Sequence, residues 1–270
     1  MGSRFDEHER AQWSGRGSVY RDTLAALCAG PASALLSAAG VSAGATVLDV
    51  GTGSGTVASL AVARGASVVA VDAEPSMVAL AACRVPSASF HLAALPALPF
   101  AAGAFDAAVA NFVVNHVGDP LAAVAELGRV VRPGGRVAVT VWPHPQPVAQ
   151  RLWTDIFAAA AVARPPDLPR VDAAHDFARS VEGLSSLLHR CGYADVAGAE
   201  ISWVHKTTSE AWWDGPAAGI GATGAVLAAQ DAETRARVRS EFNRLTTPFT
   251  EADGQLAMPT AAVLARGRVA

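Results

Sequence analysis

The stretch VLDVGTGSGTVASLAVARGASVVAVDAEPSM, residues 47–77, decides the fold of this chain. Its short apolar runs at 46–50 and 67–71 are typical of parallel strands that are buried on both faces. The first run leads directly into alternating glycines at 51–55, and a helix is expected over 57–64. Glycine permits positive φ and a close approach of a ligand to the backbone. This strand–turn–helix–strand pattern therefore predicts a ligand at the end of the first strand of an open α/β sheet.

Three kinds of ligand are compatible with a glycine turn, and the residues around it separate them. A P-loop needs a lysine directly after the glycines, but the only lysine in the chain is Lys206. A dinucleotide-binding turn of the GxGxxG type has a third glycine where this chain has Thr56. The phosphate-binding interpretations are therefore disfavoured.

Two carboxylates flank the turn and favour a cationic cofactor. Asp49 lies two residues before Gly51, where it would repel a pyrophosphate but would suit a positively charged amine. Asp72 ends the second strand, at the place where an acidic residue accepts hydrogen bonds from ribose hydroxyls. S-adenosyl-L-methionine carries an amine, a sulfonium and a ribose diol. We therefore expect this cofactor, with S-adenosyl-L-homocysteine as its product.

The rest of the chain predicts a Rossmann-like sheet. Apolar runs alternate with helical segments, which indicates a seven-stranded, mostly parallel sheet with helices on both faces. Later strands are expected at 88–92, 105–111, 136–142, 195–206 and 258–269, the last two as a closing hairpin-like pair, and helices at 75–84, 120–131 and 184–191.

Two segments outside the sheet are expected to cover its end. Residues 1–42 are predicted to form an N-terminal helical cap, with helices near 16–28 and from Pro31 to Gly40. Residues 43–270 then form the cofactor-binding domain. An insertion at about 145–180, after the fifth strand, is rich in proline and is expected to cover the substrate.

Composition excludes several classes of function. The chain has 270 residues, of which 51% are hydrophobic and 17% charged, so a sizeable core is expected rather than disorder. The net charge of −3 does not indicate a nucleic-acid partner. Three widely spaced cysteines form no zinc or disulfide pattern, and neither a signal peptide nor a membrane span is recognised. A cytoplasmic monomer or homodimer is expected.

Four segments together resemble the class I S-adenosylmethionine-dependent methyltransferases, in particular the small-molecule group related to the ubiquinone-biosynthesis methyltransferases. They are VLDVGTGSG (47–55), VVAVDAEPSM (68–77), LPALPFAAGAFDAAVA (95–110) and LGRVVRPGGRVAVTVW (127–142), in the order and spacing of that family. The resemblance extends from about Thr46 to the C-terminus and is weakest over 145–180.

The resemblance implies a set of cofactor-binding residues. The turn and Asp49 would hold the amino-acid end, Asp72 the ribose, and later residues the adenine and the methyl donor. The family often has an aspartate where this chain has Ala94, so the adenine would be read by the backbone N–H of Leu95. The implied set is Asp49, Gly51, Thr52, Gly53, Asp72, Ala73, Met77, Ala94, Leu95, Asn111, Phe112 and His116.

The acceptor side is expected from residues outside the sheet core. His116 is the candidate general base, because the segment after the fourth strand reaches the active site in this fold. Candidate substrate-binding residues are Trp13, Arg16, Tyr20, Trp142 and Trp153. No cluster of metal ligands is recognised, and an apolar, aromatic pocket favours a small organic acceptor.

Two functions remain open from the sequence. The first is methyl transfer to O, N or an acidic carbon of a small molecule, for which proximity and alignment supply most of the catalysis. The second is a protein of this fold that binds the cofactor without transferring the methyl group, as a cyclase-like or regulatory module. Intact Asp49, Asp72 and glycines favour the first, whereas Ala94 favours the second.

Overall fold

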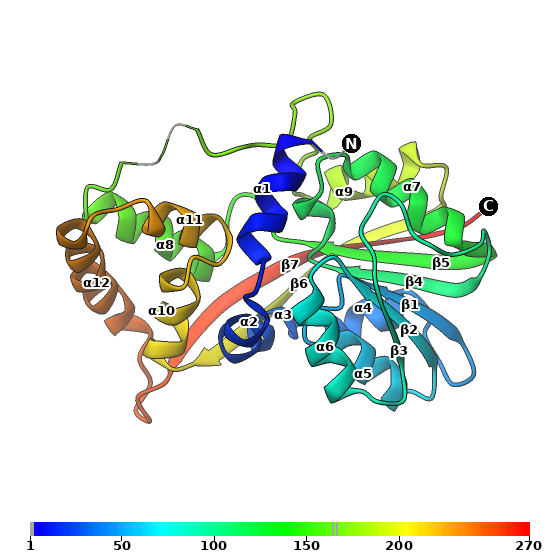
Figure 1. The fold of residues 1–270 in the computed structure, drawn as a ribbon, viewed down its shortest axis with the longest axis horizontal. Coiled ribbons are helices and arrows are strands. Elements are labelled where there is room, and N and C mark those ends of the chain that lie inside the picture. Colours follow the sequence, from blue (N-terminus) through cyan, green and yellow to red (C-terminus); the bar gives the residue numbers. More distant parts are fainter. Residues whose placement is uncertain (1–2, 164, 166) are drawn as a thin grey trace.

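One seven-stranded sheet forms the centre of the computed structural model, which describes residues 3–163, 165 and 167–270. The strand order is β3-β2-β1-β4-β5-β7-β6, with parallel pairs from β3 to β5 and antiparallel pairs on both sides of β7 (Figure 1). The predicted fold class and the closing antiparallel pair are confirmed. The strands are β1 Thr46–Val50, β2 Ser67–Asp72, β3 Ser89–Leu92, β4 Phe105–Asn111, β5 Val131–Val141, β6 Ala194–Thr207 and β7 Leu256–Arg268.

Helices cover both faces of the sheet. On one face, α4 (Ala32–Ala38) and α5 (Thr56–Ala63) pack on the small and β-branched residues of β1, β2 and β4. On the other face, α7 (Pro120–Val130) and α9 (Val181–Arg190) bury a leucine-rich core. The helix α6 (Pro75–Arg84) packs beside β2 and β3. Because chain order reverses between β1 and β4, a crevice is expected beyond the carboxyl ends of these strands.

A second group of helices packs on the far ends of β6 and β7. These two strands are paired from Ala194 to Thr207, well beyond the other strands. The group consists of α8 (Val148–Ala159), α10 (Ser209–Ala217), α11 (Gly221–Ala228) and α12 (Ala232–Thr246), and Figure 1 shows it to the left of the parallel strands. We call these four helices the helical lobe. Its own hydrophobic core includes Trp153, Ile156, Phe242 and Met258.

Besides α4, three short helices precede the sheet. The helix α1 spans Arg4–Trp13 and runs between the parallel strands and the helical lobe (Figure 1). The expected helix at 16–28 is two helices, α2 (Gly17–Thr23) and α3 (Ala25–Cys28). The sequence analysis missed α1, although Ser3 and Asp6 form a capping box at its start.

The predicted boundaries differ from the structure after β4 as well. The segment expected to be a covering insertion contains α8, an amphipathic helix whose apolar face belongs to the lobe core. The RPGG turn at 132–135 lies within the bounds of β5, where the pairing with β4 shifts between Val131 and Arg136. Two short 3₁₀ turns, Val114–His116 and Thr247–Phe249, complete the elements. Those parts of the predicted cap and insertion that fall on 1–2, 164 and 166 lie outside the described residues.

Truncation of the lobe core tests its contribution to stability. Phe242 is fully buried against Trp153 and Trp213, with ring centroids 5.4 and 5.2 Å away. We expect Phe242→Ala to lower the free energy of unfolding by about 3–5 kcal/mol, measured by chemical denaturation. The control is Leu92→Ala, at a side chain that is 59% exposed, which should change it by less than about 1 kcal/mol. Equal effects of the two substitutions would contradict the assignment of a packed lobe core.

Candidate functional site

The glycine turn follows β1 and has no room for side chains on the cavity side. Gly51 and Gly53 have φ values of +68° and +54°. A Cβ on Gly51 would lie 2.3 Å from Cγ2 of Val113, and one on Gly53 would lie 3.0 Å from Cε1 of Tyr20. Both the conformation and these close neighbours therefore require glycine, and both glycines line the cavity described below.

Asp72 at the end of β2 holds the turn in place. Its Oδ2 accepts a hydrogen bond of 2.8 Å from the N–H of Gly53, and its Oδ1 accepts one of 3.0 Å from the N–H of Glu74. Burial raises the pKa of Asp72, while these backbone N–H groups lower it. Each carboxylate oxygen can accept more than one hydrogen bond. Asp72 therefore fixes the turn and keeps acceptor capacity for hydroxyl groups of a ligand.

Asp49 lies behind the turn and is almost completely buried, with 1% of its surface exposed. Its Oδ2 accepts a hydrogen bond of 2.7 Å from Oγ1 of Thr52. Its Oδ1 has no hydrogen-bond partner in the part of the chain that the structure describes. Burial raises the pKa of Asp49 to about 7, although the Thr52 hydroxyl opposes the shift. A cationic group near the turn would stabilise the ionised form of this carboxyl group.

A cavity of about 1060 Å³ opens beyond the carboxyl ends of β1, β2 and β4. Its walls come from the glycine turn, from α1, from the loop after β4 and from the helical lobe. This volume reaches the upper range of small-molecule sites and leaves room for two ligands side by side. Predicted site residues that line the cavity are Trp13, Tyr20, Gly51, Gly53, Asp72, Ala73, Met77, Ala94, Leu95, Asn111, Phe112, His116, Trp142 and Trp153.

An aromatic wall separates the turn from the helical lobe. Phe112 has a positive φ of 58°, and its ring stacks on Trp142 with centroids 3.8 Å apart. Its backbone N–H donates to the carbonyl and to the hydroxyl of Thr140, which hold this conformation. Trp153 and Trp212 extend the apolar surface into the lobe. The wall suits a flat, apolar molecule.

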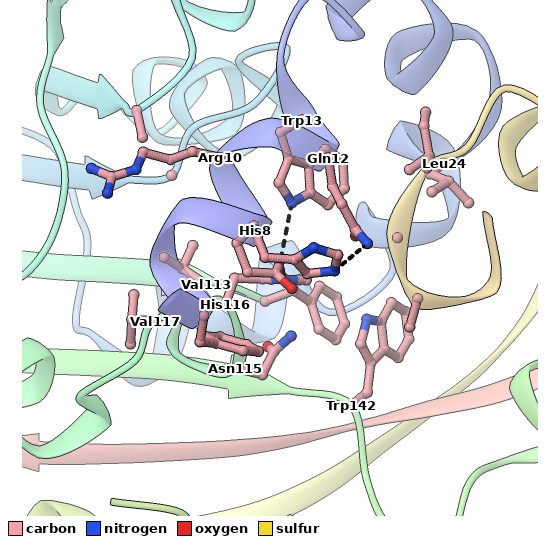
Figure 2. Close-up of a pocket in the computed structure, with 18 of the residues that line it drawn as sticks. His8, Arg10, Gln12, Trp13, Leu24, Val113, Asn115, His116, Val117 and Trp142 are labelled. Atoms are coloured by element: carbon pink, nitrogen blue, oxygen red, sulfur yellow. Dashed lines mark hydrogen bonds and ion pairs between the residues drawn. The ribbon is translucent and has the colours of Figure 1, made fainter. Parts of the chain in front are cut away.

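The helix α1 lies over the cavity and is attached on several sides. The N–H of Gly118 donates to Asp6 at 2.7 Å, and the N–H of Gly15 donates to Glu74 at 3.1 Å. Burial alone would raise the pKa of Asp6, but the hydrogen bond from Gly118 and those from Ser3 bring it below its usual range. Figure 2 shows His8, Gln12 and Trp13 of this helix beside the loop after β4.

His116, the candidate base, is on that loop and contacts α1. Its Nδ1 lies 2.7 Å from Oε2 of Glu9. The ring of Trp13 stands edge-on to the His116 imidazole, with centroids 5.6 Å apart (Figure 2). Both residues line the cavity.

Four predicted residues have positions that the sequence did not indicate. Asp49, Thr52 and Arg16 do not line the cavity. The guanidinium of Arg16 donates to the carbonyl oxygens of Gln12 and Gly219, the latter at 2.7 Å, and so connects α1 to the turn between α10 and α11. Asn111 lines the cavity, but its amide donates to the carbonyl of Cys28 and accepts from the Thr140 hydroxyl.

The sequence analysis missed Glu9, His8 and Gln12. They line the cavity because α1 lies over it, and the capping pattern SRFD at 3–6 was the signal that could have placed a helix there. No sequence spacing indicates a contact between Glu9 and His116, which are 107 positions apart.

The described residues offer neither a metal site nor a membrane-spanning helix. They contain no group of three or more His, Cys, Asp or Glu side chains placed to hold a metal ion. Among the helices of the described ranges, none combines the length and the apolar character required to span a bilayer.

Sequence comparison matches residues 48–139 to the family model described as "Methyltransferase domain". A demethylmenaquinone methyltransferase of Renibacterium salmoninarum is 37% identical over 111 residues, which are 41% of this chain and 47% of that protein. A second one, from Beutenbergia cavernae, is 38% identical over 112 residues, 42% of this chain and 47% of that protein. The chain thus spans about half the length of the curated relatives it matches.

Solved structures share the fold over most of the chain. The YcgJ protein of a Bacillus species superposes with a TM-score of 0.54 at 18% identity, covering 88% of this chain and 97% of that one. Phosphoethanolamine N-methyltransferase 2 of Haemonchus contortus, solved with S-adenosyl-L-methionine, gives 0.52 at 16% identity, covering 88% and 52%. The [4+2]-cyclase SpnF gives 0.50 at 19% identity, covering 88% and 80%. These likenesses establish the fold.

The buried Asp49 carboxyl group makes stability depend on pH. Because its pKa in the folded chain is raised, the free energy of unfolding should fall as pH rises from about 4 to about 7 and then level off. Asp49→Asn removes this cost, so the unliganded variant should be more stable than the wild type at pH 8 by roughly 1–4 kcal/mol. At pH 4 the two should be nearly equal.

Chemical denaturation at both pH values measures the difference. Asp72, whose pKa is also raised by burial, leaves a pH dependence of the same sign in the variant. If Asp49→Asn were less stable than the wild type at pH 8, burial of the ionised Asp49 carboxylate could not be what lowers the free energy of unfolding.

Proposed function

We propose that this chain, whose residues 48–139 match the methyltransferase domain family and whose fold is shared with solved methyltransferase structures, transfers a methyl group from S-adenosyl-L-methionine to a small organic acceptor. The cofactor and the acceptor are part of this proposal. The observation that carries it is the glycine turn with its two carboxylates, Asp49 and Asp72, at the mouth of one large cavity.

The residues at the turn fit a cofactor of this chemistry. Gly51 and Gly53 line the cavity and present bare backbone to the amino-acid end. Oδ1 of Asp49, which has no hydrogen-bond partner among the described residues, adds negative potential behind the turn. Asp72 is placed to accept hydrogen bonds from the ribose. Met77 and Ala94 belong to an apolar slot for the adenine. When bound, the cofactor would supply an activated methyl group on a sulfonium sulfur.

The protein's own contribution is to bind, align and exclude water. The stacked Phe112 and Trp142 form a rigid apolar wall beside the turn, and α1 covers it. Holding two reactants in line in such a site is the main source of rate enhancement in a displacement reaction. We propose that residues 1–42 act as the cap and that the helical lobe, rather than the 145–180 segment alone, shapes the acceptor site.

The acceptor proposed is a flat, largely apolar molecule. Trp142, Trp153 and Trp212 line its part of the cavity, with the polar side chains of Gln146 and Gln150 among them. Demethylmenaquinone methyltransferases among the relatives support an aromatic acceptor. The free cysteines Cys28, Cys83 and Cys191 support a reducing, cytoplasmic setting.

The second candidate function is binding without methyl transfer. Ala94 offers no side-chain hydrogen bond at the position where the resembled family often has an aspartate. A cyclase also has this fold, so the fold alone does not select the reaction.

Titration calorimetry tests the cofactor site. S-adenosyl-L-methionine and S-adenosyl-L-homocysteine should each bind once per chain, and Asp72→Ala should weaken both about 10- to 100-fold, because hydrogen bonds to a charged group are lost. The matched control is Asp155→Ala, on the exposed face of α8, which should leave the affinity unchanged. Absence of binding of either compound to the wild type would overturn the proposal.

Transfer is separated from binding by radiolabel. The wild type is incubated with methyl-labelled S-adenosyl-L-methionine and a panel of phenols, hydroxyquinones, amines and keto acids. Label on a product supports the methyltransferase. Cofactor binding with no labelled product over the whole panel would favour the binding module.

A further inference from the structure

We infer that Glu9 is a positioning residue that orients His116 as a general base, and that the acceptor therefore carries an acidic O–H or C–H proton. This inference rests on the proposed function and deepens it. It starts from the contact between Oε2 of Glu9 and Nδ1 of His116, at 2.7 Å. Neither the family match at 48–139 nor any sequence motif includes Glu9.

The Glu9 carboxylate is held in a single position. It is 15% exposed at the side chain, and its Oε2 also lies 3.4 Å from the indole Nε1 of Trp13. Trp13 packs edge-on against both His116 and Tyr20, at 5.6 and 5.8 Å between centroids. The Glu9 carboxylate therefore accepts hydrogen bonds from two packed rings, those of His116 and Trp13, rather than from solvent.

This contact fixes the tautomer of His116. A carboxylate accepts hydrogen bonds only, so Nδ1 carries the proton and the lone pair of the neutral imidazole is on Nε2. In the described part of the chain, Nε2 has no hydrogen-bond partner, and His116 lines the cavity. Nε2 is thus available to accept a proton from a molecule in the cavity. The contact of Nδ1 with Glu9 sets the orientation of the His116 ring.

Other charged side chains lie on α1 or line the same cavity. On α1, Asp6 accepts from the Gly118 N–H and His8 contacts Gln12. Arg10 lies on α1 as well (Figure 2), and Arg170, Asp176 and Arg179 line the cavity from the loop after α8. Glu9 is the carboxylate in direct contact with the His116 ring.

The arrangement predicts the proton step. An O–H bond of the acceptor breaks, its electron pair stays on oxygen, and the proton binds to the lone pair of Nε2. The resulting imidazolium faces the Glu9 carboxylate, which stabilises its charge. The oxygen, now an anion, would be the nucleophile for the methyl group, whose bond to the sulfonium sulfur would break and leave its electron pair on sulfur. For an acidic carbon the same step leaves the pair on carbon. An acceptor such as a tertiary amine needs no base. The Glu9–His116 pair, which we call the dyad, therefore favours phenolic, enolic or C–H acidic acceptors.

The dyad also links catalysis to the position of α1. Glu9 comes from α1 and His116 from the 3₁₀ turn after β4, and the Asp6–Gly118 hydrogen bond holds the same two segments together. The helix that covers the cavity therefore completes the base. A general base becomes available only with the cap in place, which protects the nucleophile from water.

Nitrogen-15 NMR of ring-labelled histidine tests the dyad without any acceptor. In the wild type, neutral His116 should be the Nδ1–H tautomer. Glu9→Ala should shift it to Nε2–H, whereas Glu9→Gln, whose amide oxygen can still accept from Nδ1, should keep it. The matched control is Glu7→Ala, an exposed glutamate on the same helix, which should have no effect. A wild-type Nε2–H tautomer, or no change in Glu9→Ala, would overturn the inference.

Kinetics distinguish positioning from a structural role. With an acceptor phenol from the labelled panel, Glu9→Ala and His116→Ala should each lower kcat about 10- to 100-fold, and the double variant should lose no more than the worse single one. With 4-nitrophenol at pH 9, where the acceptor is already ionised and needs no base, the loss of activity in each variant should be clearly smaller. Equal losses on both acceptors would show a structural role and contradict the inference.

The two proposals fail in different ways. Calorimetry with S-adenosyl-L-homocysteine should give wild-type affinity for Glu9→Ala, which confirms that the fold and the cofactor site are intact. If the wild type binds no cofactor, the proposed function fails. If it binds cofactor but His116 has the wrong tautomer, only the dyad fails.

Discussion

The hydrogen bond from the Gly53 N–H to the Asp72 carboxylate is the contact on which the site depends. It ties the turn after β1 to the end of β2, at the point where chain order in the sheet reverses. Gly51 and Gly53 in this turn have left-handed conformations, and Val113 and Tyr20 occupy the space that side chains at these positions would need. The backbone that faces the cavity is therefore free of side chains.

Electrostatics and packing divide the cavity into two parts. Near the turn, two carboxylates with raised pKa values create a region in which positive charge is favoured. Away from it, the stacked Phe112–Trp142 pair and the tryptophans of the helical lobe form an apolar surface. The proposed cationic donor and flat, apolar acceptor would therefore occupy different sides of one cavity. The Glu9–His116 pair lies at the cap, where a proton leaving the acceptor can be taken up.

The features of the fold and the site that could be predicted are those whose interacting residues lie close together in the sequence. The parallel strands, the glycine turn and Asp72 are specified by residues close in sequence, and the structure confirms the sheet that they predict. The packing of the helical lobe could not be predicted, because its core joins α8 to helices more than fifty residues later. Glu9 was missed for the same reason, since its role depends on where α1 docks. Arg16 was expected at the substrate, but its guanidinium binds backbone carbonyls between elements.

A crystal structure of the chain with S-adenosyl-L-homocysteine tests the central claim most directly. The account predicts the ribose hydroxyls within hydrogen-bond distance of the Asp72 carboxylate, the amino-acid end against Gly51 and Gly53, and the thioether sulfur facing the Phe112–Trp142 wall. A ligand bound away from the glycine turn, or oriented with its adenine against Phe112 and Trp142, would contradict it.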